Sequence, residues 1–257
     1  MYEQITYRLN GINEVKYIWK GKQGRKGETR APKRKPTRKE VELQNRRNKR
    51  DKIHRELIVN FTEEDYWVTL TYKKGERKNM EGVKKDFKRL RENLGRAYQK
   101  QGEKLKWMVV IEIGKKGGIH LHMVMNSLPQ TIGCLNKYWK QGHIHVVPLY
   151  PENERKQLAD YMAKMPDEEE NEGEIPPKDK LPETQKENYY YSSSKNLIRP
   201  QPERKRYKRR TMRKILENGP EPTEGFYIVK DTVRKGVNRF TGYSYLYYTE
   251  VTLRRRN

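Results

Sequence analysis

The sequence predicts an α+β fold, in which an antiparallel β-sheet is flanked by helices and carries a basic N-terminal arm and a C-terminal strand extension. Three observations support this class. Short runs of apolar and β-branched residues recur along the chain, as strands require. Two of these runs meet at a glycine-rich turn, which makes them antiparallel neighbours. Between the strands, residues 80–101 carry apolar side chains at the spacing of an amphipathic helix.

The N-terminal part of the chain divides into a hairpin and a basic segment. Residues 1–19 alternate in polarity on both sides of Asn10-Gly11, which is a strong turn signal, so this segment should form a β-hairpin. Residues 20–60 are rich in lysine and arginine. They should form a mobile basic arm that becomes helical from about Thr37.

The middle of the chain, residues 61–166, should form the core of the fold. Its predicted strands cover residues 67–72, 106–113, 118–126 and 143–149. Its predicted helices cover residues 80–101, 131–140 and 151–165. An acidic loop is expected at residues 167–188. Residues 189–257 should complete the domain, with a basic helix near 202–217 and strands around 226–231 and 243–251.

Composition and charge limit the function. Of the 257 residues, 33% are hydrophobic and 36% are charged, so one core spanning the whole chain is not expected. The net charge of +24 indicates a polyanionic partner, with nucleic acid favoured over an anionic membrane. No run approaches the ~18 apolar residues of a membrane span, and we recognise neither a signal peptide nor an ATP-binding motif. Cys134 is the only cysteine, which fits a reducing cytoplasm.

The strand predicted at residues 118–126 carries a His-x-His pair. Alternate side chains of a strand leave on the same face, so His120 and His122 should point the same way, roughly 7 Å apart. Glu112 lies on the preceding strand. If Glu112 stands opposite His120, one carboxylate and two imidazoles converge. Such a set suits Mg²⁺ or Mn²⁺ and leaves coordination positions for phosphate oxygens.

The turn between these two strands decides whether that site forms. A symmetric turn with an even number of residues would place Glu112 on the opposite face from His120. We therefore predict an odd loop or a bulge in the segment 113–119, where glycines make positive φ angles accessible. A second His-x-His pair at His143 and His145 is the alternative metal site, but it has no acid at hairpin distance before it.

The helix predicted at residues 151–165 contains Tyr161-x-x-Lys164, whose two side chains share one helix face. Tyr161 could instead belong to an apolar core stripe with Leu158 and Met162. A neutral phenol, with a pKa near 10, is a poor nucleophile. A metal on the phosphate, with Lys164 stabilising the developing anion, would make attack by Tyr161 feasible. We therefore expect Tyr161 to be the nucleophile and Lys164 its helper.

Three motifs, in this order, resemble those of rolling-circle replication initiators, the single-tyrosine HUH endonucleases of small phages and plasmids. They are Trp67-Val68-Thr69-Leu70-Thr71-Tyr72, Gly118-Ile119-His120-Leu121-His122 and Tyr161-x-x-Lys164. Two further segments resemble phage-type members, namely Trp139-x-x-Gly142 and Ser192-Ser193-Ser194-Lys195. The similarity covers about residues 66–200. No second tyrosine follows four residues from Tyr161, which agrees with the one-tyrosine group.

The resemblance implies an HUH endonuclease-like catalytic core at residues 61–166. Tyr161 would cut single-stranded DNA at a replication origin, stay linked to the 5′ phosphate and leave a free 3′ hydroxyl before the strands are rejoined. The metal ligands would be Glu112, His120 and His122. Further DNA contacts are expected at Thr69, Thr71, Lys115, Lys116 and Lys195. Host helicase and polymerase would be partners in the cytoplasm of a bacterial cell.

Other interpretations stay open at this point. A relaxase or a single-tyrosine transposase would use the same chemistry, although the tyrosine helix and the serine-rich segment favour replication. A protein without catalytic activity could bind nucleic acid through charge and aromatic stacking alone. Binding alone does not require the set Glu112, His120, His122 and Tyr161, so these residues distinguish the two classes.

Overall fold

The computed structural model describes residues 1–21, 34–76, 78–114, 117–149, 151, 155–164 and 188–253, without the side chain of Arg209. Predictions for residues 22–33, for Lys115 and Lys116, and for the acidic segment 167–187 lie outside the described residues. The chain forms two compact units. The terminal unit comprises Met1–Asn45 and Arg199–Asn257, and the central unit comprises Arg46–Ile198.

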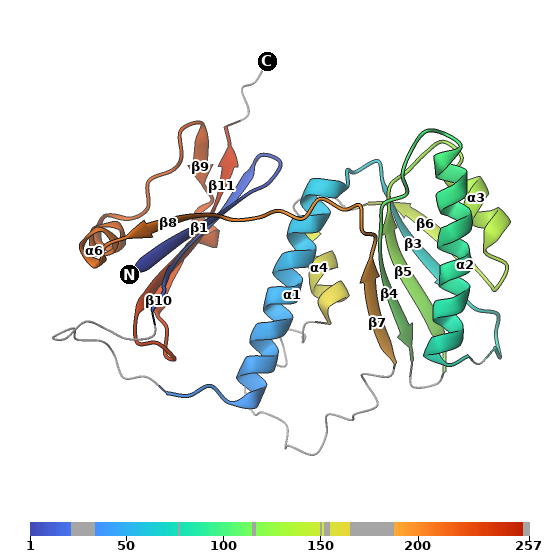
Figure 1. The fold of residues 1–257 in the computed structure, drawn as a ribbon, viewed down its shortest axis with the longest axis horizontal. Helices are drawn as coiled ribbons and strands as arrows, with labels where there is room; N and C mark the ends of the chain where they lie inside the picture. The colour runs from blue at the N-terminus through green and yellow to red at the C-terminus, as the bar shows by residue number, and fades with distance from the viewer. Residues whose placement is uncertain are drawn as a thin grey trace. The chain divides into compact units, whose positions relative to one another are not determined.

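The central unit is built on a five-stranded antiparallel sheet with the order β6-β3-β5-β4-β7 (Figure 1). Its strands are β3 Tyr66–Thr71, β4 Trp107–Ile113, β5 Ile119–Met125, β6 Ile144–Pro148 and β7 Tyr189–Ser193. The first four lie within one residue of their predicted bounds. The strand that carries His120 and His122 therefore occupies the middle of the sheet. The sequence pattern missed β7, which pairs with β4.

Helices cover both faces of this sheet. α2 Met80–Gln99 and α3 Thr131–Tyr138 lie on one face, whereas α4 Arg155–Ala163 and the second half of α1 Arg38–Asn60 lie on the other (Figure 1). Strand alternation divides the core between the two sides. The α2 side receives Val109, Ile111, Leu121 and Met123, and the α1 side receives Met108, Val110 and Val124. Each buried aliphatic side chain contributes roughly 1.5–3 kcal/mol to folding.

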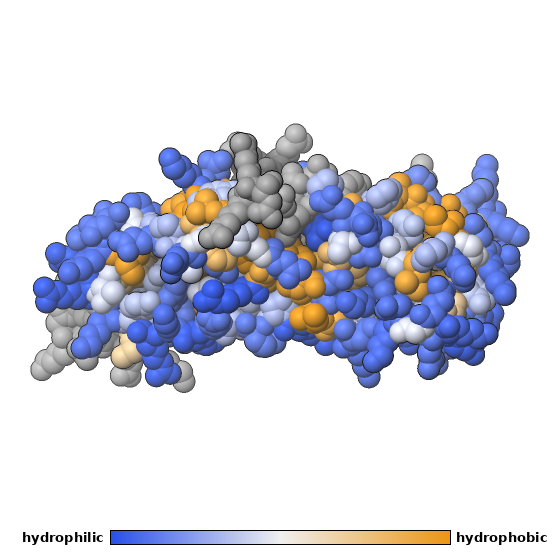
Figure 2. All heavy atoms as spheres, turned by 90° about the horizontal axis from the view of Figure 1, so that it is seen from above, coloured by the Kyte–Doolittle hydropathy of each residue, from blue (hydrophilic) through white to orange (hydrophobic). Residues whose placement is uncertain are grey.

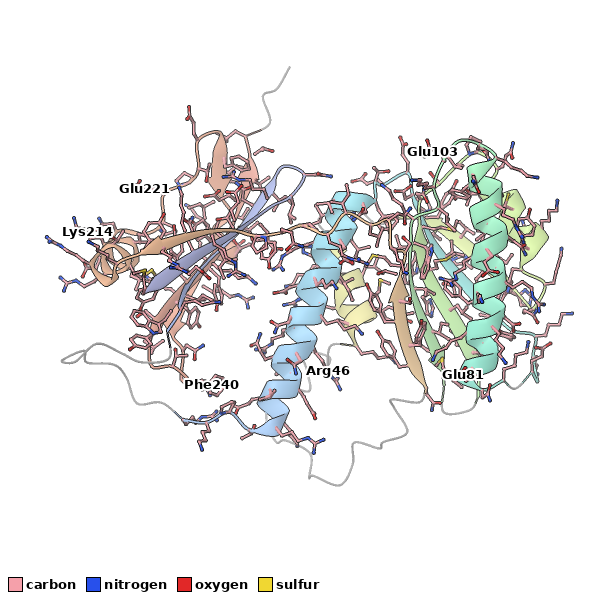
Figure 3. The ribbon with its side chains drawn as sticks, viewed as in Figure 1. Arg46, Glu81, Glu103, Lys214, Glu221 and Phe240 are labelled. Carbon is pink, nitrogen blue, oxygen red and sulfur yellow. The ribbon has the colours of Figure 1, made fainter. Side chains whose placement is uncertain are left out.

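Helix α2 follows directly from its sequence. The side chain of Asn79 caps it by accepting a hydrogen bond from the Gly82 amide at 2.9 Å. Its buried residues recur at helical spacing and are Val83, Phe87, Leu90, Leu94 and Tyr98. Figure 3 shows Glu81 in the first turn of α2 and Glu103 just beyond its end. The predicted helix thus forms where the apolar stripe places it.

The terminal unit contains a six-stranded sheet with the order β10-β11-β2-β1-β8 and with β9 beside β11. Its strands are β1 Tyr2–Arg8, β2 Ile12–Trp19, β8 Glu203–Tyr207, β9 Phe226–Ile228, β10 Arg234–Val237 and β11 Ser244–Thr252. β1 and β2 form the predicted hairpin. Helix α6 Arg209–Asn218 buries Met212 in a core with Val15 and Leu246, and a short 3₁₀ helix η3 covers Lys230–Thr232.

The C-terminal region differs from the sequence expectation in two ways. The pattern favours a helix near residues 202–217, but Glu203–Tyr207 is strand β8 and the helix begins only at Arg209. The reason is long-range: β8 adds to the edge of β1, where Arg204 donates to Glu3 at 2.7 Å. We also expected residues 189–257 to complete a single domain. Of this region, β7 joins the central sheet and the later strands join the terminal sheet.

The surface reflects the composition, in which 36% of residues are charged. On the face drawn in Figure 2, hydrophilic residues predominate and apolar residues appear in limited patches between them. Within the described ranges, no helix combines the length and the apolar character that crossing a membrane requires. Such a surface suits contact with a charged partner.

Candidate active site

The register of β4 and β5 places the predicted metal ligands on one face. Glu112 pairs with His120, and Ile113 pairs with Ile119, which leaves residues 114–118 as an odd-numbered loop. The amide of Gly114 donates to the Gly118 carbonyl at 2.7 Å. The register prediction is therefore confirmed. Directly paired residues of an antiparallel sheet share a face, so Glu112 and both histidines lie on the α1 and α4 side.

Strand β3 supports His122 from the other flank. Thr69 pairs with His122, and the Thr69 hydroxyl and His122 Nδ1 form a hydrogen bond at 3.2 Å. The Trp67 ring stacks on the imidazole with a centroid distance of 5.5 Å and an interplanar angle of 13°. These contacts fix the ring and leave Nε2 as the nitrogen available to another partner. Trp67 was not among our predicted site residues, although its position two residues before Thr69 puts it on the same face.

Helix α4 brings Tyr161 to these residues. The Tyr161 hydroxyl donates to Glu112 Oε2 at 3.3 Å, and its ring stands edge-on to His122 with centroids 5.2 Å apart. Leu158 and Met162 of the same helix are buried, whereas Tyr161 is 40% exposed. The interpretation of Tyr161 as a core residue is thereby contradicted, because the helix buries its neighbours and leaves the phenol at the surface of the sheet.

Lys164 closes the cluster. It ends α4 in a left-handed conformation with φ of 55°, unusual for a residue other than glycine. Its carbonyl accepts a hydrogen bond from Arg46 of α1 at 3.0 Å, and Figure 3 labels this arginine. Its ammonium lies 2.8 Å from Glu112 Oε1. The Glu112 carboxylate therefore faces Tyr161 with one oxygen and Lys164 with the other.

The local electrostatics keep Tyr161 protonated. Burial raises the pKa of its hydroxyl above the ordinary value, and the neighbouring Glu112 carboxylate raises it further. Burial also lowers the pKa of His122, an effect that Glu112 opposes. At neutral pH the phenol is accordingly a neutral donor toward Glu112. It would need a nearby positive charge during any attack on phosphorus.

The histidines differ in exposure and engagement. His120 is exposed, and its ring lies parallel to that of His122 with centroids 6.0 Å apart. In the part of the chain that the structure describes, no three His, Cys, Asp or Glu side chains are arranged to hold a metal ion as they stand. The alternative pair lies farther from Glu112, because His143 precedes edge strand β6 and His145 pairs across β3 with Thr69. The ligand roles stay predictions.

The remaining predicted residues divide between the two faces. Thr71 pairs with His120 and marks the end of β3, where its carbonyl accepts the Trp139 indole N–H at 3.2 Å. Lys195 follows β7 and lines a groove with Trp107, away from Tyr161. Tyr189 was also missed: its hydroxyl donates to the Met162 carbonyl of α4, and Lys164 lies over its ring at 5.2 Å. No local motif marks it, because β7 reaches the site only through sheet pairing.

Comparison with known proteins supplies one match. Residues 65–166 match the model of a family described as replication-associated protein ORF2. This segment contains β3 through β6 and α4, and therefore Glu112, both paired histidines of β5, and Tyr161. A search of curated proteins and a search of solved structures gave no match.

Proposed function

We propose that this protein is a replication initiator that nicks single-stranded origin DNA through Tyr161 and later rejoins the strands. The observation that carries the proposal is the convergence of Tyr161, His122 and Lys164 around Glu112 at an accessible edge of the central sheet. The match of residues 65–166 to a replication-associated family supports the same assignment. The charge of +24 supports a nucleic-acid substrate.

In the proposed reaction, the Tyr161 oxygen attacks a DNA phosphorus atom. A tyrosine O–P bond forms while the P–O3′ bond breaks, which leaves a 5′ phosphotyrosine link and a free 3′ hydroxyl. The phenol proton has an acceptor in Glu112 Oε2, to which the hydroxyl already donates. The Lys164 ammonium stands on the other side of this carboxylate and can stabilise charge on the phosphate oxygens. Attack by the 3′ hydroxyl of a strand on the same link would rejoin DNA and release Tyr161.

The donor set supports a divalent metal in this reaction. Glu112 Oε1 is buried and, among the described residues, receives no hydrogen bond of regular geometry, although the Lys164 ammonium is 2.8 Å away. A buried carboxylate oxygen held by charge alone is one that a cation can approach. With His120 and His122 on the same face, these residues fit Mg²⁺ or Mn²⁺ by their chemistry. Such an ion, when bound, polarises the scissile phosphate.

The experiment is to incubate the protein with single-stranded origin-like DNA and Mn²⁺ and to look for a covalent adduct on a denaturing gel. Tyr161→Phe should abolish both the adduct and nicking while DNA affinity stays within about twofold, because the phenol contributes chemistry rather than charge. Tyr189→Phe is the matched control, since it removes a hydroxyl from the same cluster and should keep the adduct. If Tyr161→Phe still forms the adduct at the wild-type rate, another residue is the nucleophile.

The same assay separates the alternatives. DNA binding without any adduct under Mg²⁺ or Mn²⁺ would favour a binding protein without catalysis. An adduct that forms on transfer-origin or transposon-end sequences, but not on replication origins, would favour a relaxase or a transposase. Under the proposed function, host helicase and polymerase would extend the 3′ hydroxyl in the bacterial cytoplasm.

A further inference from the structure

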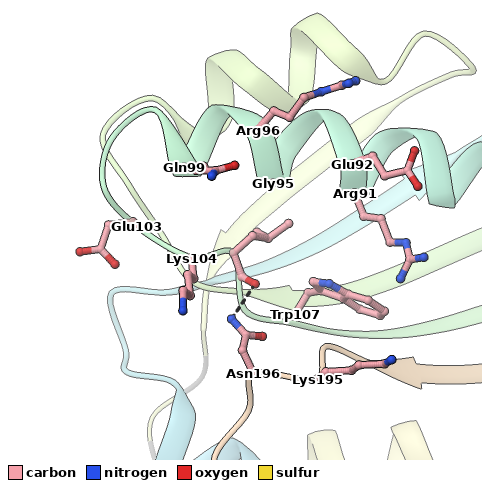
Figure 4. Close-up of a pocket in the computed structure, with 11 residues that line it drawn as sticks. Arg91, Glu92, Gly95, Arg96, Gln99, Glu103, Lys104, Trp107, Lys195 and Asn196 are labelled. Atoms are coloured by element: carbon pink, nitrogen blue, oxygen red, sulfur yellow. Dashed lines mark hydrogen bonds between the residues drawn. The ribbon is translucent and has the colours of Figure 1, made fainter.

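A basic groove lies in the central unit beside the second half of α2. Its volume is about 720 Å³, and its walls come from α2, from the segment 103–105 after it, from the start of β4 and from the segment after β7 (Figure 4). The side chain of Asn196 ties two of these walls together by donating to the Leu105 carbonyl at 3.2 Å. The groove is thus a built feature of four chain segments rather than a gap between loops.

The groove is separate from the candidate active site. Trp107 belongs to the core on the α2 face, whereas Glu112 lies on the opposite face of β4. The two residues are also five positions apart along the strand, which corresponds to roughly 16 Å. A ligand in this groove would therefore not touch Tyr161, and its contacts would be additional to those at the site of cleavage.

The charges that face this groove are mostly positive. Arg91, Lys104 and Lys195 approach from three different segments, and Arg96 stands at the rim. Figure 4 shows Arg91 and Lys195 on either side of the Trp107 ring, and the Arg91 guanidinium carbon lies 5.6 Å from the ring centroid. Within the described residues, none of these four cations forms a salt bridge, so their charge is available to a ligand.

A glycine forms part of the wall on the helix side. Gly95 lies in the middle of α2, and a Cβ atom added there would meet nothing within 4 Å. Core contacts therefore do not require a glycine at this position, which a helix would fill more favourably with alanine. The missing side chain leaves the helix backbone open to the close approach of a ligand, one of the recognised uses of glycine.

We propose that this groove binds the sugar–phosphate backbone of single-stranded DNA that flanks the cleaved phosphate. The inference rests on the proposed function for the identity of the ligand and names a second contact for it. Trp107 is buried beneath Arg91, so the groove offers charge rather than a free aromatic surface for bases. Its contacts should accordingly hold any DNA sequence alike and contribute to the salt dependence of binding.

The test measures binding to a mixed-sequence single strand of about 30 nucleotides, a length that exceeds a typical binding site, by fluorescence anisotropy in the Tyr161→Phe background. The double variant Lys104→Gln/Lys195→Gln should raise the Kd about tenfold at 0.1 M salt and flatten the salt slope by about 1.4. Lys85→Gln/Arg89→Gln removes the same charge from exposed positions of α2 outside the groove and should change the Kd less than threefold. Gly95→Leu keeps the charge, should keep or raise Tm, and should raise the Kd several-fold.

The outcomes are distinct from those of the nicking assay. Equal losses in the groove variant and in the Lys85→Gln/Arg89→Gln control would overturn the proposal, because bulk charge alone would explain them. Unchanged affinity in both the groove variant and Gly95→Leu would overturn it as well. With Tyr161 present, the groove variant should still form the adduct at saturating DNA. If wild-type protein forms no adduct while the groove variants lose affinity as expected, nicking fails and the groove stands as a binding site.

Discussion

Gly142→Ala should displace the end of β3, because residue 142 touches the backbone of that strand. A Cβ atom at residue 142 would lie 2.2 Å from the Thr71 carbonyl oxygen and 2.7 Å from the carbonyl carbon of Tyr72. Trp139, from the same turn, donates its indole N–H to this Thr71 carbonyl. The Trp139-x-x-Gly142 motif therefore fixes the end of β3 through an approach that only glycine allows.

The size of the effect follows from the atoms involved. Adding a methyl group to a well-packed site costs about 1–3 kcal/mol when neighbours can adjust. Here the neighbours are backbone atoms that cannot rotate away, so we expect about 3 kcal/mol, or a fall in Tm of about 6–12 °C for a unit of this size. Gly133→Ala is the matched control. Its Cβ would meet nothing within 4 Å in helix α3, and alanine there should add about 0.5–1 kcal/mol.

Tryptophan fluorescence during thermal and urea unfolding measures this difference. Of the four tryptophans, Trp67, Trp107 and Trp139 lie in the central unit, so the signal reports mainly on that unit. Adduct yield per folded molecule should also fall in Gly142→Ala, because Thr69 of the same strand positions His122. A Gly142→Ala protein as stable as wild type would refute the close approach of residue 142 to β3.

Two further predictions concern carboxylates. In Glu112→Gln the pKa of the Tyr161 phenol should fall, because the negative charge that raises it is removed while burial persists; NMR of ¹³C-labelled tyrosine, with Tyr161→Phe to identify the signal, measures it, and an unchanged value would contradict the contact. Glu40, bonded to Arg34 and to the Thr37 amide, should titrate with a pKa of about 2. Its capping contribution should therefore be present above pH 4.5 and lost as pH falls toward 2, and Arg34→Ala should move the Glu40 carboxyl resonance toward ordinary glutamate behaviour.

Local pattern was sufficient for the paired strands and for the face of the site. Alternation along β4 and β5 identifies which side chains share a face, and the glycines between them favour a loop of odd length. The position of Tyr161 beside the histidines also agrees with its motif order. The sequence could not indicate that Glu112 would contact both Tyr161 and Lys164, because this depends on how α4 docks on the sheet.

Long-range pairing accounts for what the sequence did not predict. β8 is a run of charged residues with helix-forming character, and it becomes a strand because β1 offers it an unpaired edge. β7 likewise depends on β4, and through it Tyr189 reaches α4. The division into two units arises in the same way, since β11 pairs with β2 although more than two hundred residues separate them. Such contacts leave no periodic signal in either segment.

The ion pair between Lys164 and Glu112 is compatible with both proposed roles of these residues. As a metal ligand, Glu112 has to release the ammonium, and Lys164 has to turn toward the phosphate. The Lys164 side chain is 48% exposed and that of Glu112 is 21% exposed, so solvent screens the pair. Pairs of this kind contribute about 0–1 kcal/mol, which is small beside the several kcal/mol that charge stabilisation supplies to phosphoryl transfer. Opening the pair is thus inexpensive, and DNA and a metal ion together offer each partner a stronger interaction than the one it gives up.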